Sequence, residues 1–298
     1  MSESPAEAAP EQKRITLRDM RRWAQSGTPF AMLTCYDATT AAWLWRGGVR
    51  TLLVGDTAAQ VILGHDSTLP ATMDFMVTLT AAVRRGAPNA LVMADMPFGS
   101  YQAEPAEAIR NASRFLKEAG ADLVKLEVTD RDADLVEQLA HAGVPVVAHL
   151  GSRPQQVRAE GGYRSAGRTE SEATRLAETA SLMVDRGAAA VLVEAVPGPV
   201  GRQIVDAVST APAPVAGPGI REQAGGAPRV PVIGCGAGPA CHGHVVVLQD
   251  LLGLTDWAPP FVTTTSDIGP RIQAAARDWV ELVQSGRYLA DGGPYHMR

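Results

Sequence analysis

Short apolar segments alternate with amphipathic segments along almost the whole chain. The apolar segments occupy residues 30–35, 51–54, 91–94, 123–126, 144–148, 190–193 and 230–233, with a weaker eighth around residues 260–263. They are rich in Val and Leu and lack polar alternation, which is typical of strands buried on both faces. Because helical segments separate them, we expect parallel strands joined by right-handed crossovers.

The segments between the predicted strands carry a helical pattern, clearest at residues 105–119, 132–142, 170–186 and 201–208. Gly120, Gly143 and Gly187 follow three of them, and a left-handed glycine commonly ends a helix. Asp37 is expected to cap a helix at residues 38–45 rather than to belong to a site. About eight strand–helix units favour a closed α/β TIM barrel, (βα)₈. A doubly wound sheet stays an alternative, although no G-x-G-x-x-G motif follows the first strand.

The two ends of the chain differ in character. Residues 1–13 are polar and rich in Ala, Glu and Pro, so we expect a disordered N-terminal tail. Residues 14–298 are expected to form a single barrel domain, because no internal repeat or linker requires a second one. Within this domain, residues 209–229 are rich in Ala, Pro and Gly and predict a long surface loop.

Composition and charge argue against several classes of function. The formal net charge is −5 and no run of Lys or Arg stands out, so nucleic acid and anionic membranes are poor partners. No apolar stretch is long enough to span a membrane and no secretory leader is present, so we expect a cytoplasmic protein. Three cysteines argue against a disulfide framework. Cys235, Cys241, His242 and His244 lie close together, but their spacing fits a Gly-rich loop better than a zinc site.

Polar side chains stand at the ends of five consecutive predicted strands. They are Asp56, Asp95, Lys125 with Glu127, His149 and Glu194. Because catalytic residues of such barrels lie at the C-terminal ends of the strands, we expect these side chains to converge at one mouth of the barrel. Lys125 and Glu127 are two positions apart and therefore point to the same side of their strand. One charge alone would only mark a strand leaving the core, but five in succession favour a functional site.

Several carboxylates crowded together would repel one another, and charges are rarely buried unless they are paired or bound to metal. A hard divalent cation with oxygen ligands resolves this conflict. A 2-oxo acid can chelate such a cation, which then stabilises its enolate. Glu194, followed by Ala195 and Val196, is our candidate for the base that removes the C3 proton. Lys125 would supply positive charge to the substrate carboxylate or the enolate.

The stretches that contain these residues resemble the ketopantoate hydroxymethyltransferase family, from about residue 28 to residue 288. The matching stretches are residues 33–37, 54–57, 64–70, 82–88, 94–98, 124–127, 149–151, 161–163 and 193–194. The resemblance implies a TIM barrel of the phosphoenolpyruvate mutase/isocitrate lyase superfamily type, assembled as a homo-oligomer, a decamer. It also implies transfer of a hydroxymethyl group from 5,10-methylenetetrahydrofolate to 3-methyl-2-oxobutanoate, giving 2-dehydropantoate in pantothenate synthesis.

The same resemblance assigns roles to residues of this chain. Mg²⁺ would be bound by Asp56, Asp95 and Glu127. Glu194 would be the general base, with Lys125 beside it as the second catalytic residue. The oxo acid would be contacted by polar side chains in or just after the second to fifth predicted strands: Asp56, Thr57, Asp95, Lys125 and His149.

The chain also departs from the family pattern, mostly at the outer mouth. Thr57 stands where the family usually has Ser, and Pro260 where it has Lys. His242 and His244 stand in place of a D-G-Q motif, and Arg153 replaces an uncharged residue. These differences keep open the same hydroxymethylation chemistry on another 2-oxo acid, in a specialised pathway. A carbon–carbon lyase or mutase of the superfamily is disfavoured because no cysteine lies near His149, and a non-catalytic relative because no site residue is lost.

Overall fold

The protein is described by a computed structural model, in which residues 13–210, 230–290 and 293 are placed. The predicted tail lies outside the described residues except for Lys13, and so does most of the loop predicted at residues 209–229. Of that loop, Ser209 and Thr210 instead belong to a helix. No helix in the described ranges combines the length and the apolar character needed to cross a membrane.

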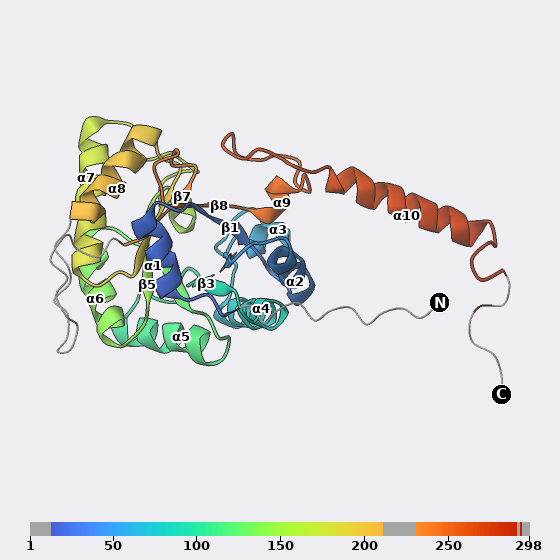
Figure 1. Ribbon diagram of the computed structural model, residues 1–298, viewed down its shortest axis with the longest axis horizontal. Helices are drawn as coiled ribbons and strands as arrows, with labels where there is room; N and C mark the ends of the chain where they lie inside the picture. Colours follow the sequence, from blue (N-terminus) through green and yellow to red (C-terminus); the bar gives the residue numbers. More distant parts are fainter. Residues whose placement is uncertain (1–12, 211–229, 291–292, 294–298) are drawn as a thin grey trace. The chain divides into compact units, whose positions relative to one another are not determined.

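Eight parallel strands form a closed barrel in chain order, with the last strand hydrogen-bonded to the first (Figure 1). Their bounds are β1 Phe30–Thr34, β2 Thr51–Val54, β3 Leu91–Asp95, β4 Leu123–Glu127, β5 Val146–Gly151, β6 Ala190–Glu194, β7 Val232–Cys235 and β8 Gly243–Val246. Strands β2, β3 and β4 are buried along their whole length, as their continuous apolar sequences predict. The predicted closed barrel is confirmed.

Helix α1 precedes β1, and helices α2 to α8 follow β1 to β6 on the outside of the barrel (Figure 1). Their bounds are α1 Leu17–Ser26, α2 Ala38–Arg46, α3 Ala58–Val61, α4 Met73–Gly86, α5 Pro105–Lys117, α6 Ala133–His141, α7 Glu170–Asp185 and α8 Gly198–Thr210, with short 3₁₀ turns η1 Asp130–Asp132 and η2 Pro154–Gln156. Asp37 caps α2 as predicted, since its carboxylate accepts from the backbone N–H of Thr40 at 2.8 Å. Gly120, Gly143 and Gly187 adopt the predicted left-handed conformation, with φ of 70°, 82° and 93°.

The eighth strand was predicted in the wrong place. It is β8, at residues 243–246, whereas residues 260–263 form a turn and irregular backbone. The stretch expected to be a Gly-rich loop therefore contains a barrel strand. Cys241 and His244 pack against Gly234 of β7, where an added Cβ would lie 2.9 Å from the Cys241 sulfur. His242 Nδ1 accepts from the backbone N–H of Val232 at 2.9 Å. These contacts join two strands, and no metal-binding group of three such residues exists in the described part of the chain.

The chain divides into two compact units. The first, Met1–Val246, holds all eight strands and α1 to α8, and the second, Val247–Arg298, holds α9 Leu248–Leu251 and α10 Ile268–Gln284. The expectation of one domain over residues 14–298 stays a prediction. Every predicted site residue lies in the first unit.

Candidate active site

The strand-end side chains meet at one mouth of the barrel and form a connected set. The backbone N–H of Asp56, just after β2, donates to Asp95 Oδ2 at 3.1 Å. Asp95, at the end of β3, lies with its Oδ1 3.0 Å from Lys125 Nζ on β4. Each of these three residues is almost completely buried. The predicted convergence of β2, β3 and β4 is therefore present in the structure.

Lys125 is a buried cation held by its neighbours. Burial alone would lower the pKa of its ammonium, but the charges of Asp95, Asp56 and Glu127 raise that pKa above its usual value. Lys125 Nζ also lies 3.3 Å from His149 Nδ1 on β5. Because an ammonium can only donate hydrogen bonds, His149 Nδ1 must accept this one from Lys125. The Lys125 side chain therefore supplies a fixed positive charge inside the barrel mouth.

His149 links Lys125 to Glu194. It is fully buried, and burial, followed by the charge of Lys125, lowers its pKa so that the ring is neutral. With Nδ1 accepting, the ring proton lies on Nε2, which faces Glu194 Oε2 at 3.4 Å. Glu194 ends β6 and keeps 26% of its side chain exposed, so it is the member of this set most open to the barrel mouth.

The site carries more negative than positive charge. Burial, followed by the charge of Asp95, raises the pKa of Asp56 to about 7. Burial also raises the pKa of Glu127 to about 9, although Lys125 acts in the opposite direction. Three acidic side chains, Asp56, Asp95 and Glu127, thus stand around Lys125, and Glu194 follows beyond His149. This charge balance costs stability unless a further cation or proton compensates it.

Gln155, on the short turn η2, is a site residue that the sequence analysis missed. Its backbone N–H donates to both carboxylate oxygens of Glu127 at 3.1 and 3.2 Å. Its side-chain Nε2 donates to Asp56 Oδ2 at 2.9 Å and to the Met96 carbonyl at 2.9 Å. The Tyr101 hydroxyl donates to its Oε1 at 2.7 Å. Gln155 therefore fixes two carboxylates from different strands at once.

Thr57 lies beside this network. Its hydroxyl is 2.7 Å from the hydroxyl of Tyr36, and the two oxygens share a hydrogen bond. Tyr36 is buried, and burial raises its pKa, so the phenol stays protonated and keeps a donor for Thr57 or for a ligand. Neither tyrosine of the site was found from the sequence, because Tyr101 lies in the loop after β3 and Tyr36, although it follows β1, carries no charge that would mark a strand end.

The donor chemistry of the site fits a hard divalent cation. Its buried oxygens come from carboxylates that repel one another. Carboxylate oxygens are ligands that Mg²⁺ prefers. Within the described residues, however, no three Asp, Glu, His or Cys side chains are grouped closely enough to hold one ion together. The assignment of Asp56, Asp95 and Glu127 as metal ligands therefore stays a prediction.

Comparison with known proteins agrees with this architecture. The family model described as Ketopantoate hydroxymethyltransferase matches residues 14–221 and 219–291. The chain belongs to the ketopantoate hydroxymethyltransferase family. As a member of this family it is an enzyme, a one-carbon transferase, which confirms the expected class.

Relatives in the ketopantoate hydroxymethyltransferase family match over nearly the full length. A 3-methyl-2-oxobutanoate hydroxymethyltransferase of Mycobacterium ulcerans (strain Agy99) is 39% identical, over 97% of this chain and 90% of the relative. One of Heliobacterium modesticaldum (strain ATCC 51547 / Ice1) is 40% identical, over 95% of each chain. Among solved structures, 2,3-dimethylmalate lyase, a PEP mutase/isocitrate lyase superfamily member, is similar with a TM-score of 0.56 at 16% identity, covering 91% and 89%. This last likeness confirms the predicted fold class.

Proposed function

We propose that the enzyme transfers a hydroxymethyl group from 5,10-methylenetetrahydrofolate to 3-methyl-2-oxobutanoate, giving 2-dehydropantoate for pantothenate synthesis in the cytoplasm. The observation that carries the proposal is the connected path from Asp95 through Lys125 and His149 to Glu194, at the mouth of a barrel of this family. This path places a buried cation and a more open carboxylate on two sides of one histidine. Abstraction of a proton next to a carbonyl requires such a pair of groups.

Mg²⁺ is the metal we propose for this site, held by Asp56, Asp95 and Glu127. Because Mg²⁺ usually keeps several waters, not all three carboxylates need to contact it directly. When bound, the ion would polarise the keto group of the oxo acid and stabilise negative charge on its oxygen. The raised pKa values of Asp56 and Glu127 support the proposal, since a divalent cation would favour their ionised forms.

The residues of the chain then have distinct tasks. Glu194 removes the C3 proton of the oxo acid, and the electron pair of that C–H bond forms the new C–C bond to the one-carbon unit. The two bonds from that carbon to the folate nitrogens break, water supplies the hydroxyl oxygen, and tetrahydrofolate leaves. Lys125 holds the substrate carboxylate or the developing enolate with its fixed charge. Neutral His149 keeps Lys125 and Glu194 apart and directs its Nε2 proton toward Glu194. The hydroxyl of Thr57, which shares a hydrogen bond with Tyr36, would contact the oxo acid.

Exchange of the C3 proton in D₂O tests the proposal without the donor. With Mg²⁺ present, 3-methyl-2-oxobutanoate should lose its C3 proton signal in NMR spectra. Glu194→Gln keeps the shape of the side chain but cannot accept the proton, so exchange should fall by roughly 10²–10⁴-fold while the substrate still binds. Lys125→Ala should weaken binding and exchange together.

Two results would contradict parts of the proposal. Exchange at the wild-type rate in Glu194→Gln would move the base elsewhere, with His149 as the next candidate. Faster exchange of another 2-oxo acid in a panel would favour the alternative, the same chemistry on a different substrate. Thr57 gives this alternative a structural basis, because its methyl group occupies space next to the substrate-contacting hydroxyl.

A further inference from the structure

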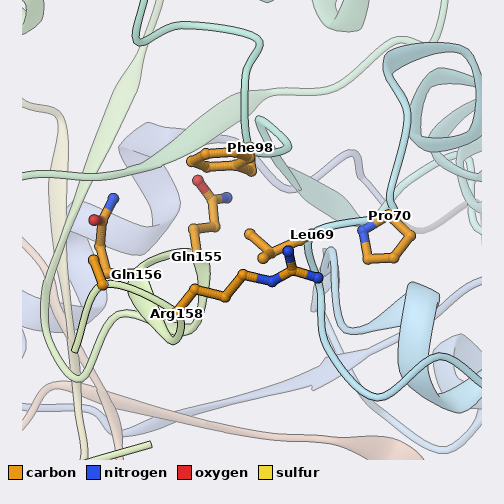
Figure 2. A pocket seen from close by; sticks show the side chains of 7 residues that line it. Leu69, Pro70, Phe98, Gln155, Gln156 and Arg158 are labelled. Atoms are coloured by element: carbon orange, nitrogen blue, oxygen red, sulfur yellow. The ribbon is translucent and has the colours of Figure 1, made fainter. Parts of the chain in front are cut away.

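A pocket of about 430 Å³ opens beside the carboxylates of the active site. Its lining comes from three loops that follow β2, β3 and β5: Leu69, Pro70, Phe98, Gln155, Gln156, Arg158 and Ala159. In Figure 2 the side chains of Phe98, Gln155, Leu69 and Arg158 surround one space. The volume falls in the range of small-molecule sites and is far larger than a small oxo acid requires.

Gln155 joins this pocket to the reacting centre. The residue lines the pocket, and its side-chain Nε2 donates to Asp56 Oδ2 at 2.9 Å. Its backbone N–H donates to both oxygens of Glu127. A molecule in the pocket would therefore lie one side chain away from the carboxylates assigned to the metal and the oxo acid. A second substrate bound there would lie next to the oxo acid, and its reacting carbon would have to extend past Gln155 into van der Waals contact with C3 for a new bond to form.

The chemistry of the lining selects a particular kind of ligand. Phe98 leaves 47% of its surface exposed, and Leu69 and Pro70 add further apolar surface. Arg158 is exposed and has no ion-pair partner among the described residues, whereas nearby Arg153 pairs with Glu160 at 2.8 Å. An apolar wall with one unpaired guanidinium suits a flat, partly aromatic ligand that carries a carboxylate.

We propose that this pocket binds the one-carbon donor, with its aromatic part against Phe98 and Leu69 and a carboxylate on Arg158. The proposal rests on the proposed function, since the donor named there, 5,10-methylenetetrahydrofolate, has an aromatic ring and a glutamate. The oxo acid would be held separately by Lys125 and its neighbours, so the two substrates would occupy adjoining parts of the barrel mouth.

Arg158→Ala tests the pocket, with Arg175→Ala on α7 as a control that removes the same charge from an exposed position outside the lining. In steady-state assays Arg158→Ala should raise the KM for 5,10-methylenetetrahydrofolate roughly ten- to a hundredfold, the loss expected for one hydrogen bond to a charged group. The KM for 3-methyl-2-oxobutanoate and the donor-free C3 exchange rate should stay at wild-type values. Arg158→Lys should recover part of the loss, and Phe98→Ala should also raise the donor KM.

The outcomes separate this inference from the function on which it rests. If the wild-type enzyme exchanges the C3 proton but Arg158→Ala and Phe98→Ala leave the donor KM unchanged, the donor binds elsewhere and the inference is wrong. If Arg175→Ala raises the donor KM as much as Arg158→Ala, general charge and not this pocket explains the effect, which also overturns the inference. If the wild-type enzyme neither exchanges the proton nor turns over with this pair of substrates, the proposed function itself fails.

Discussion

Glu194 is held in place by its backbone neighbours as well as by His149. Gly151, at the end of β5, approaches the Glu194 carbonyl so closely that an added Cβ would lie 2.2 Å from that oxygen. Gly151 also has φ of 99°, a conformation that side chains with a Cβ rarely adopt. Ala195, the next residue after Glu194, has φ of 50° and is one of two described non-glycine residues in the left-handed region. Strain of this kind persists where surrounding structure fixes a functional residue.

Gly151→Ala should therefore damage both stability and proton abstraction. The new Cβ cannot fit against backbone, so β6 must shift at Glu194, and we expect a loss of about 3 kcal/mol or more. Gly143→Ala is the matched control, because Gly143 also has positive φ but has no atom within 4 Å of an added Cβ. That control should cost only about 1–2 kcal/mol of backbone strain and leave C3 exchange unchanged. Equal unfolding free energies for the two variants in urea would contradict the argument.

Gln155 is a positioning residue, since it contacts Asp56 and Glu127 and would act through them. Gln155→Ala removes the side-chain hydrogen bond to Asp56, so Mg²⁺ affinity measured by calorimetry should fall roughly 10–100-fold, as for other residues that orient ligands. Excess Mg²⁺ should then restore most of kcat. Gln156→Ala is the control. Gln156 is the adjacent residue and lines the same pocket, but among the described residues its side chain forms no hydrogen bond to Asp56 or Glu127. Unchanged Mg²⁺ affinity with reduced kcat would assign Gln155 a purely structural role.

At the level of single elements, the sequence predicted the first seven strands and the helices α2, α5, α6, α7 and α8, because their patterns are continuous. It did not predict α1, α4 or α10. It failed at β8, where Gly243 and exposed His244 break the apolar run that marks a buried strand. Lys125 and Glu127 were predicted correctly as a pair because alternation along a strand is fixed by geometry. Gln155 was not, because it lies on a 3₁₀ turn whose direction depends on packing against β3 and β4. Its place in the polar loop after β5, four residues beyond the strand end, was a weak signal for it.

Two thiols, of Cys35 just after β1 and of Cys241 just before β8, lie where they should be unreactive. Burial raises the pKa of Cys35 and of Cys241 to about 11. At pH 8 only about one thiol in a thousand is then ionised, and the thiolate is the reactive form. In native protein we expect disulfide-exchange reagents to label at most Cys235, with labelling of the other two growing as pH rises toward 11. Denaturant should expose all three, so rapid labelling of Cys35 or Cys241 at pH 8 without it would contradict the burial described here.

At the scale of the whole molecule, the second unit contains a helix whose apolar face is exposed among the described residues of that unit. Helix α10 has no buried residue, and Ile272, Trp279 and Val283 are each about half exposed. Their spacing of seven and four positions puts them on one face of the helix. Exposed apolar faces of this kind commonly mark interfaces, and the predicted decamer provides an occupant, other copies of the same chain.

The predicted decamer can be measured directly, and α10 offers the variant to test it. Light scattering on the full chain should give the mass of ten subunits of 31.4 kDa. Trp279→Glu together with Val283→Glu puts charge on the apolar face, so burying that face in an interface becomes unfavourable and the mass should fall. Arg277→Glu alters charge on the same helix away from that face and should leave the mass unchanged. If the paired variant keeps the wild-type mass, α10 does not form the interface. If the wild-type chain is monomeric, the predicted assembly is wrong.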